Sequence, residues 1–310
     1  MKPLNKQTLP YLALLCATLL WASSFVALKI AFRNFDPMVV IFSRMLVGSF
    51  CFLFLYRFYK NTAIHKKDLF SLFLLVLFEP CLYFLFEAKA IQYTTASQAG
   101  MISAFLPMLV AVGAFFVLKE NLTVRIVTGL FISIVGVCWL SISGSPALDA
   151  PNPALGNFYE FLAMVFAAGY TIVLKQLTNS RYSALFLTAI QAFAGSIFYF
   201  PLLFLPSTNL PVTFDPVSLG AIVYLGSAVT LGAYACFNYG VSKIPAGRAS
   251  AFVNLIPVFS LFMGIIILGD AFNPQQCAAC LLIFSGLLVS QDVKMKSLKK
   301  LVPARINRPQ

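Results

Sequence analysis

The chain has 310 residues, of which 60% are hydrophobic and 10% are charged, and its mean hydropathy is +0.88. A soluble domain carries about 25% charged residues, so this composition excludes a soluble protein and indicates an integral membrane protein. The net charge of +12 is not evidence for a nucleic-acid partner, because the basic residues lie in short segments between apolar runs, where orientation signals belong. The expected surroundings are therefore a lipid bilayer, with no nucleic acid.

Apolar segments follow one another along the chain, each long enough for a helix that crosses the bilayer. We number them as spans 1 to 10, and they cover residues 9–32, 37–59, 68–91, 96–118, 123–143, 154–178, 181–205, 217–243, 246–269 and 272–291. A membrane barrel would show alternating strands of about ten residues, whereas these runs are longer and continuously apolar. The sequence predicts an all-α integral membrane protein with ten transmembrane helices.

The second half of the chain repeats the first. Residues that coincide after a shift of about 150 positions are Pro107 with Pro257, Gly136 with Gly286 and, in spans 2 and 7, Ser49 with Ser196. A repeat at a fixed period marks a duplicated unit. Because each unit has five spans, the two copies must have opposite orientations, as in many secondary transporters. We expect a first five-helix repeat at 1–143, a periplasmic linker at 144–157, a second repeat at 158–293 and a basic tail at 294–310.

The basic residues predict the orientation. With the N-terminus in the cytoplasm, most of the 22 Lys and Arg residues fall in cytoplasmic segments, and only Arg33 and Lys89 fall in outer ones. The linker 144–157 has no basic residue. By the positive-inside rule, both termini of this multi-pass protein are expected in the cytoplasm.

Glu79 is the leading candidate for a functional residue. It lies midway along span 3, where a carboxylate is costly unless it faces a cavity or a partner. Tyr83 and Glu87 follow at helical spacing, and Pro80 leaves a backbone carbonyl without its donor. These residues predict a polar strip along a pathway. The alternative is a buried ion pair between Glu79 and Arg44 of span 2 that only fixes packing.

Two prolines at equivalent positions, Pro107 in span 4 and Pro257 in span 9, are expected to break their helices near the middle. Broken helices at a repeat interface bind substrate or permit rocking, although prolines can also form kinks that neighbouring helices tolerate. Gln98 and Asn254 are polar side chains close to these prolines and are further candidates for the site.

Aromatic residues supply a possible lining for the pathway, since aromatic faces suit cations and flat apolar ligands. The candidates are Trp21, Tyr83, Tyr170, Tyr234 and Tyr239, with Ser24 and Asn238 as polar neighbours. Ordinary core packing is the alternative for each of them. Small residues at positions 129, 136, 279 and 286 favour close packing of spans 5 and 10, which we interpret as structural.

The chain resembles the EamA type of the drug/metabolite transporter superfamily. The resemblance depends on Leu-Trp-Ala-Ser-Ser-Phe at 20–25, on Arg44, and on the Ser-Gln-Ala, Phe-Leu-Pro and Lys-Glu-Asn-Leu-Thr pattern through span 4, with a second copy through span 9. Ala22 departs from it, because the family usually has Gly there. The resemblance implies ten helices, cytoplasmic termini and a central cavity lined by spans 1, 3, 4, 6, 8 and 9. It also implies movement of metabolites or drugs across a bacterial cell inner membrane.

The leading hypothesis is a secondary transporter that exports small metabolites by alternating access, with Glu79 binding the substrate or a proton. A net-neutral pair of Glu79 and Arg44 favours amino acids or related zwitterions. Proton-coupled drug efflux and metabolite uptake are the alternatives. A membrane enzyme or a scaffold is disfavoured, because His65 is the sole histidine and no carboxylate cluster or phosphate-binding loop is present. We expect no catalytic residue, metal ion or cofactor, and a monomer or weak homodimer.

Overall fold

The computed structural model describes residues 8–117, 119, 123–143, 146–180, 182–211, 214–244, 249 and 251–290. The predicted basic tail, 294–310, lies outside these residues. Within them, eight helical segments are long and apolar enough to cross a membrane: α1 (Leu9–Phe32), α2 (Pro37–Phe54), Lys66–Tyr93, Ala96–Val117, α7 (Val124–Ser143), α8 (Pro153–Ser180), Ala184–Phe204 and Pro216–Lys243. Two shorter apolar segments follow, Phe252–Leu268 and α14 (Pro274–Ser290). These segments occupy the positions of the predicted spans, so the all-α membrane fold is confirmed.

Several spans are irregular, and equivalent spans of the two repeats are irregular at corresponding places. Span 3 consists of α3 (Leu69–Val76), η3 (Leu77–Leu82) and α4 (Tyr83–Tyr93), and span 8 consists of α10 (Pro216–Tyr224), η6 (Leu225–Ala233) and α11 (Tyr234–Lys243). In span 8 the middle piece is a wide π-helical turn that stays helical throughout, whereas in span 3 the backbone leaves the helical conformation at Glu79. Such turns are uncommon and frequently mark functional sites.

Spans 4 and 9 share a different interruption. Span 4 consists of α5 (Ala96–Ile102), the 3-10 turn η4 (Ser103–Phe105) and α6 (Leu106–Val117). Span 9 begins with the 3-10 turn η7 (Ala251–Leu255) and continues as α13 (Ile256–Met263) and η8 (Gly264–Leu268). Pro107 and Pro257 each stand at the second position of the helix that follows the turn, where the missing N–H leaves no hydrogen bond unmade.

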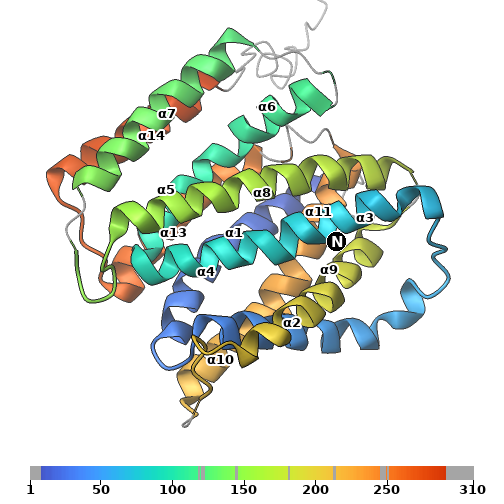
Figure 1. The fold of residues 1–310 in the computed structure, drawn as a ribbon. Helices are drawn as coiled ribbons and strands as arrows, with labels where there is room; N and C mark the ends of the chain where they lie inside the picture. Colours follow the sequence, from blue (N-terminus) through green and yellow to red (C-terminus); the bar gives the residue numbers. More distant parts are fainter. Residues whose placement is uncertain are drawn as a thin grey trace, which may run out of the picture.

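The first span of each repeat packs mainly against the other repeat. Helix α1 packs against α10, η6, α11 and α13 of the second repeat, whereas α8 packs against α3, η3, α4 and α6 of the first. The remaining equivalent spans face each other, α2 against α9 (Ala184–Tyr199), α5 against α13 and α7 against α14. The hydroxyls of the repeat mates Ser49 and Ser196 are 2.9 Å apart. The halves therefore meet along reciprocal surfaces at the middle of the bundle (Figure 1).

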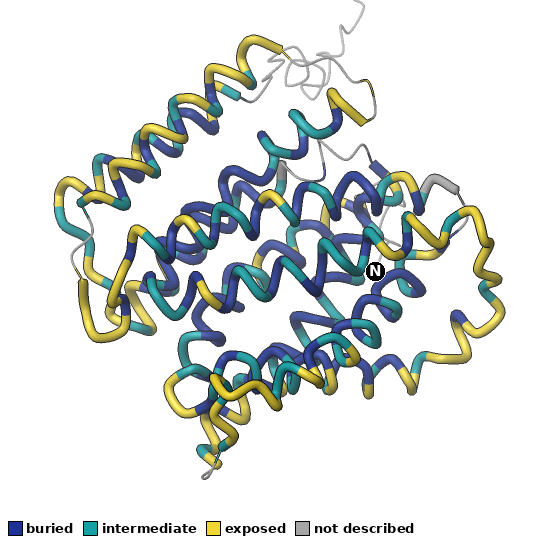
Figure 2. Tube along the Cα trace, in the orientation of Figure 1, coloured by how far each residue is buried: buried dark blue, intermediate teal, exposed yellow. Residues whose placement is uncertain are grey.

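Helices α7 and α14 form a pair at the edge of the bundle, with exposed outer faces (Figures 1 and 2). Gly129 of α7 lies against the backbone of Gly286, and the Ser133 hydroxyl donates to the carbonyl of Ile283 at 3.3 Å. Small residues allow this close approach in lipid, where packing and hydrogen bonds replace the hydrophobic effect. The predicted packing of spans 5 and 10 is confirmed.

Some helix ends differ from the predicted ones for local reasons. Helix α2 ends at Phe54, ahead of a 3-10 turn at Tyr56–Phe58. Helix α9 begins only at Ala184, because the Ser183 side chain caps it by accepting from the Phe186 amide at 3.2 Å. Helix α8 begins at Pro153, inside the predicted linker, since proline suits a first helical turn.

The α7–α14 contact predicts a stability difference between two glycines. In Gly129→Ala the new Cβ would lie 2.6 Å from the Ser290 Cβ and 2.7 Å from the Ser290 backbone nitrogen, so the helices must separate. We expect a loss of about 1–3 kcal/mol in the free energy of unfolding. Gly220→Ala is the control, because no atom lies within 4 Å of its added Cβ. Unfolding of both variants in one detergent measures the difference, and equal stability would contradict the packing.

Candidate functional site

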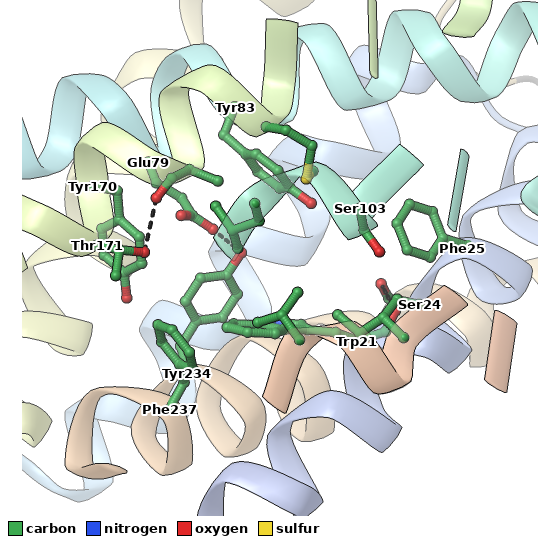
Figure 3. Close-up of a pocket in the computed structure, with 15 residues that line it drawn as sticks. Trp21, Ser24, Phe25, Glu79, Tyr83, Ser103, Tyr170, Thr171, Tyr234 and Phe237 are labelled. Carbon is green, nitrogen blue, oxygen red and sulfur yellow. Dashed lines mark hydrogen bonds between the residues drawn. The ribbon is translucent and has the colours of Figure 1, made fainter. Parts of the chain in front are cut away.

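A cavity lies at the centre of the bundle, between the two repeats (Figure 3). Its lining comes from spans 1, 3, 4, 6, 8 and 9, the set that the resemblance implied. The lining residues are Trp21, Ser24, Phe25, Glu79, Tyr83, Ser103, Leu106, Met164, Ala167, Tyr170, Thr171, Tyr234, Phe237, Val253 and Ile256. The cavity volume is about 30 Å³, enough for one or two water molecules. A metabolite can enter only if the lining helices separate.

The cavity is aromatic, with one charged wall. Glu79 is the charged side chain among the described residues that line it, and its side chain is 3% exposed. The Trp21 ring packs edge-on against Tyr234, with ring centroids 5.3 Å apart, and lies 4.7 Å from the Phe237 ring. In Figure 3, Glu79, Tyr170 and Tyr234 lie on one side of the cavity and Ser24 and Ser103 on the other. The site therefore has an acidic end and a hydroxyl end.

The backbone of span 3 breaks at Glu79. Its φ and ψ of −149° and 117° are extended rather than helical, because Pro80 disfavours the α conformation in the residue before it. The Tyr234 hydroxyl donates to the Glu79 carboxylate. The carbonyls freed by the break also find donors, since Gln191 donates to Glu79 O at 3.0 Å and Tyr199 donates to Cys81 O at 2.6 Å. Span 7 thus supplies hydrogen-bond donors for the carbonyls at the break, and the break directs the Glu79 carboxylate into the cavity.

Arg44 does not reach the cavity, and its ion-pair partner differs from the expected one. Its Nη1 lies 3.7 Å from Oε2 of Glu87, with both side chains at most 2% exposed. Its Nε donates to Thr230 at 2.9 Å, and its guanidinium lies 4.1 Å from the Phe84 ring centre. The alternative that paired Arg44 with Glu79 is therefore wrong. Tyr83 links the pair to the cavity, because it lines the cavity and its hydroxyl donates to Glu87 Oε1 at 2.6 Å.

Asn238 also lies behind the cavity wall, where it orients an aromatic residue. The Tyr170 hydroxyl donates to the Asn238 side-chain oxygen. The Asn238 amide donates in turn to Thr188 at 2.7 Å and to Gln191 at 3.4 Å. Asn238 is thus a positioning residue for Tyr170 rather than part of the lining.

Three other candidates lie away from the lining. Gln98 accepts from the Asn157 amide at 3.1 Å and lines a polar hollow of about 500 Å³ at one end of the bundle. Tyr239 lies with its ring centre 6.0 Å from the Lys243 ammonium. Asn254 is buried in η7 next to the lining residue Val253, and neither of its amide atoms has a hydrogen-bond partner among the described residues.

Sequence reasoning missed a third buried acidic residue, on span 6. Glu160 is 0% exposed, and neither of its carboxylate oxygens has a hydrogen-bond partner among the described residues. It lies one turn from Met164 and two turns from Ala167, on the face of α8 that lines the cavity. The signal was available, since an acidic residue within an apolar span is the feature that identified Glu79.

The fold and the cavity define a membrane transporter built from two helical repeats. The sequence profile of the EamA-like transporter family matches residues 8–142 and again residues 154–290, and the chain belongs to this family.

Its relatives include proteins from bacteria and archaea. The chain is 25% identical to the uncharacterized transporter YetK of Bacillus subtilis over 92% of this chain and 88% of the relative. It is 29% identical to an uncharacterized transporter of Archaeoglobus fulgidus over 87% of this chain and 94% of the relative. It is 25% identical to a probable amino-acid metabolite efflux pump of Salmonella typhimurium over 90% and 93%. A crystal structure with 19% sequence identity shares the fold, with a TM-score of 0.66 over 91% of this chain and 97% of that one.

The Arg44–Glu87 pair predicts a non-additive pattern of stability. Arg44→Gln leaves Glu87 buried and unpaired, which we expect to cost about 3–5 kcal/mol. The double variant with Glu87→Gln should lose less than the sum of the two single variants, because neither charge is then orphaned. Lys89→Gln, an exposed change on the same helix, is the control. Unfolding of all four variants in one detergent gives the coupling, and additive losses would contradict a direct pair.

Proposed function

We propose that this protein is a secondary transporter of a bacterial inner membrane that exports small metabolites with an amino group, amino-acid derivatives among them. The observation that carries the proposal is the position of Glu79 as the charged side chain in an otherwise aromatic and apolar lining. The family supplies the general activity of transport. The chemistry of the cavity lining supports the proposed substrate class.

An ammonium group suits this cavity for two reasons. It would form a charge-assisted hydrogen bond with the Glu79 carboxylate, which is stronger than a bond between neutral groups. It would also contact the aromatic faces around that carboxylate, which attract cations. A hydroxyl group at the other end of the substrate would donate to the oxygens of Ser24 and Ser103, whose own protons are donated to the backbone carbonyls of Trp21 and Gly100. Arg44 is engaged with Glu87, so the serines replace it as partners for that end.

Transport requires the cavity to widen and to open to each side in turn, since its volume of about 30 Å³ in this conformation is too small for a metabolite. The paired interruptions in spans 3 and 8 and in spans 4 and 9 supply places where the backbone can bend. Pro107 and Pro257 stand directly after two of these interruptions and are the proposed gating positions, with Pro80 in a third. Outward movement is supported by the Salmonella typhimurium relative that is described as an efflux pump.

Metabolite profiling of spent medium tests the proposal. Cells that make the protein should release a class of amino compounds that cells with Glu79→Gln, at matched expression, do not release. Asp215→Asn is the control, because it makes the same acid-to-amide change at the N-cap of α10, where Asn keeps the capping oxygen, and it should export normally. Release by the Glu79→Gln cells would remove Glu79 from the mechanism, and depletion of compounds from the medium would indicate uptake.

The amine requirement gives a second test with the compound that profiling identifies. In membrane vesicles, an analogue with hydroxyl in place of the amino group should compete at least about tenfold less well. The reason is that a hydrogen bond to a charged group contributes about 1.5–3 kcal/mol, and 1.4 kcal/mol is a tenfold change in affinity. An analogue without the carboxyl group should compete more nearly like the parent. Equal competition by the hydroxyl analogue would contradict recognition by Glu79.

A further inference from the structure

The core of the protein holds more buried acid than base. Glu79 and Glu87 of span 3 and Glu160 of span 6 are 3%, 2% and 0% exposed, and Arg44 balances one of them, Glu87. Helix α8 packs along α4, and the Tyr159 ring of α8 lies 6.2 Å from the Phe86 ring of α4, so the next residue on each helix, Glu160 and Glu87, lies at the same level of the packed pair. Tyr83 lies one turn before Glu87 on α4 and donates to it. The cluster therefore joins a helix of the second repeat to the helix of the first repeat that carries Glu79.

The other titratable groups on the elements packed around α8 do not give Glu160 a buried partner of opposite charge. On α4, Lys89 is exposed, whereas Glu160 is fully buried. Helices α5 and α6 and the turn η4 carry no titratable side chain, and η3 contributes only Glu79 and Cys81. On α7, Arg125 lies at the far end from the Asn157 contact, and Cys138 shares an apolar groove with Phe161. The basic residues of α8 and α11, Lys175 and Lys243, lie at the opposite ends of their helices from Glu160.

An ionised Glu160 would be costly in this position. Both of its oxygens are buried without a hydrogen-bond partner among the described residues. An isolated carboxylate away from water costs several kcal/mol even after relaxation, and the nearby charge of Glu87 adds repulsion. A protonated, neutral carboxyl group avoids both costs.

We propose that Glu160 and Glu87, grouped with Tyr83 between spans 3 and 6, form a proton-binding site in which Glu160 holds the proton in this conformation. The site is separate from the Glu79 cavity, although Tyr83 contacts both. Its existence does not depend on the substrate. Its use in transport rests on the proposed export function, in which one proton bound at Glu160 would move inward as one substrate molecule moves outward.

A proton fits the site better than a metal cation. A hard cation needs about six oxygen ligands. The carbonyls that the break in span 3 releases are already occupied by Gln191 and Tyr199, and the Tyr83 proton is directed at Glu87. No group of three or more acidic, His or Cys side chains among the described residues has the geometry to hold a metal ion.

A polar route leads toward Glu160 from one end of the bundle. The hollow of about 500 Å³ is lined by Gln98, Asp149 and Asp270. Gln98 accepts from Asn157 at 3.1 Å, and Asn157 lies three residues before Glu160 on the same face of α8. By the distribution of basic residues this end faces away from the cytoplasm. Protons from the outer side therefore have the shorter approach to Glu160.

Infrared spectroscopy of the purified full chain tests the site through the proton itself. At neutral pH we expect the carbonyl band of a protonated carboxyl group, shifted by transfer to deuterium oxide and by ¹³C-labelling of glutamate. The band should be absent in Glu160→Gln and present in Glu79→Gln and in the control Asp215→Asn, which lies at the start of α10, outside the cavity and the hollow, and keeps the oxygen that caps this helix. Because Gln resembles a protonated Glu in shape and charge, Glu160→Gln should also unfold at the temperature of the unchanged protein.

Several results would overturn the proposal. They are the absence of the band from the unchanged protein, its persistence in Glu160→Gln, its loss in Glu79→Gln, or its loss on addition of sodium chloride, which would assign the site to a metal cation. A Glu160→Gln protein that fails to fold would also overturn it, because a neutral side chain would then not suffice. The infrared band and the unfolding temperature are measured without transport. A failed export experiment would therefore not change the conclusion about the proton-binding site.

Discussion

Removal of charge from water is the constraint on which the rest of this structure depends. A guanidinium and three carboxylates lie at most 3% exposed in the middle of a bundle whose surroundings are apolar. Each charge is costly there, so either the surrounding side chains supply hydrogen bonds or opposite charge, as they do for Arg44, Glu79 and Glu87, or the group holds a proton, as we propose for Glu160. The network that does so draws on both repeats, since Arg44 reaches Thr230 and the carbonyl of Glu79 is held by Gln191. The polar centre is thus also what ties the two halves together.

The repeat explains why the centre is asymmetric. The backbone interruptions of spans 3 and 8 correspond, as do those of spans 4 and 9, so both halves contribute equivalent hinges. The charged side chains do not correspond, because the positions equivalent to Glu79 and Glu87 are Val229 and Phe237. At the cavity, the first repeat supplies the carboxylate of Glu79 and the second repeat supplies the Tyr234 hydroxyl that donates to it. An asymmetric site on a symmetric frame allows a substrate with distinct ends to bind in one orientation.

The sequence predicted the fold and part of the site. The length of the apolar segments was enough to predict the spans, and the prolines that coincide after a shift of about 150 positions were enough to predict the repeat. Both features can be read from residue type alone. Glu79 was recognised from its depth alone. The ion-pair partner of Arg44 was predicted wrongly, because Glu79 and Glu87 both lie on span 3. The break in the backbone at Glu79 decides which of the two carboxylates faces span 2, and the sequence does not show this break. Gln98 and Tyr239 were expected at the site but lie outside the cavity lining, because each stands toward the end of its span. The polarity of a residue does not show how deep in the span it lies.

The central claim is that the Glu79 carboxylate holds the amino group of the exported compound inside the cavity. Labelling of the purified protein with a hydrophobic carbodiimide, followed by mass spectrometry of the modified glutamates, tests it most directly. The account predicts that an exported amine protects Glu79 from the reagent, whereas its hydroxyl analogue at the same concentration does not. Equal modification of Glu79 with and without the exported amine would contradict it.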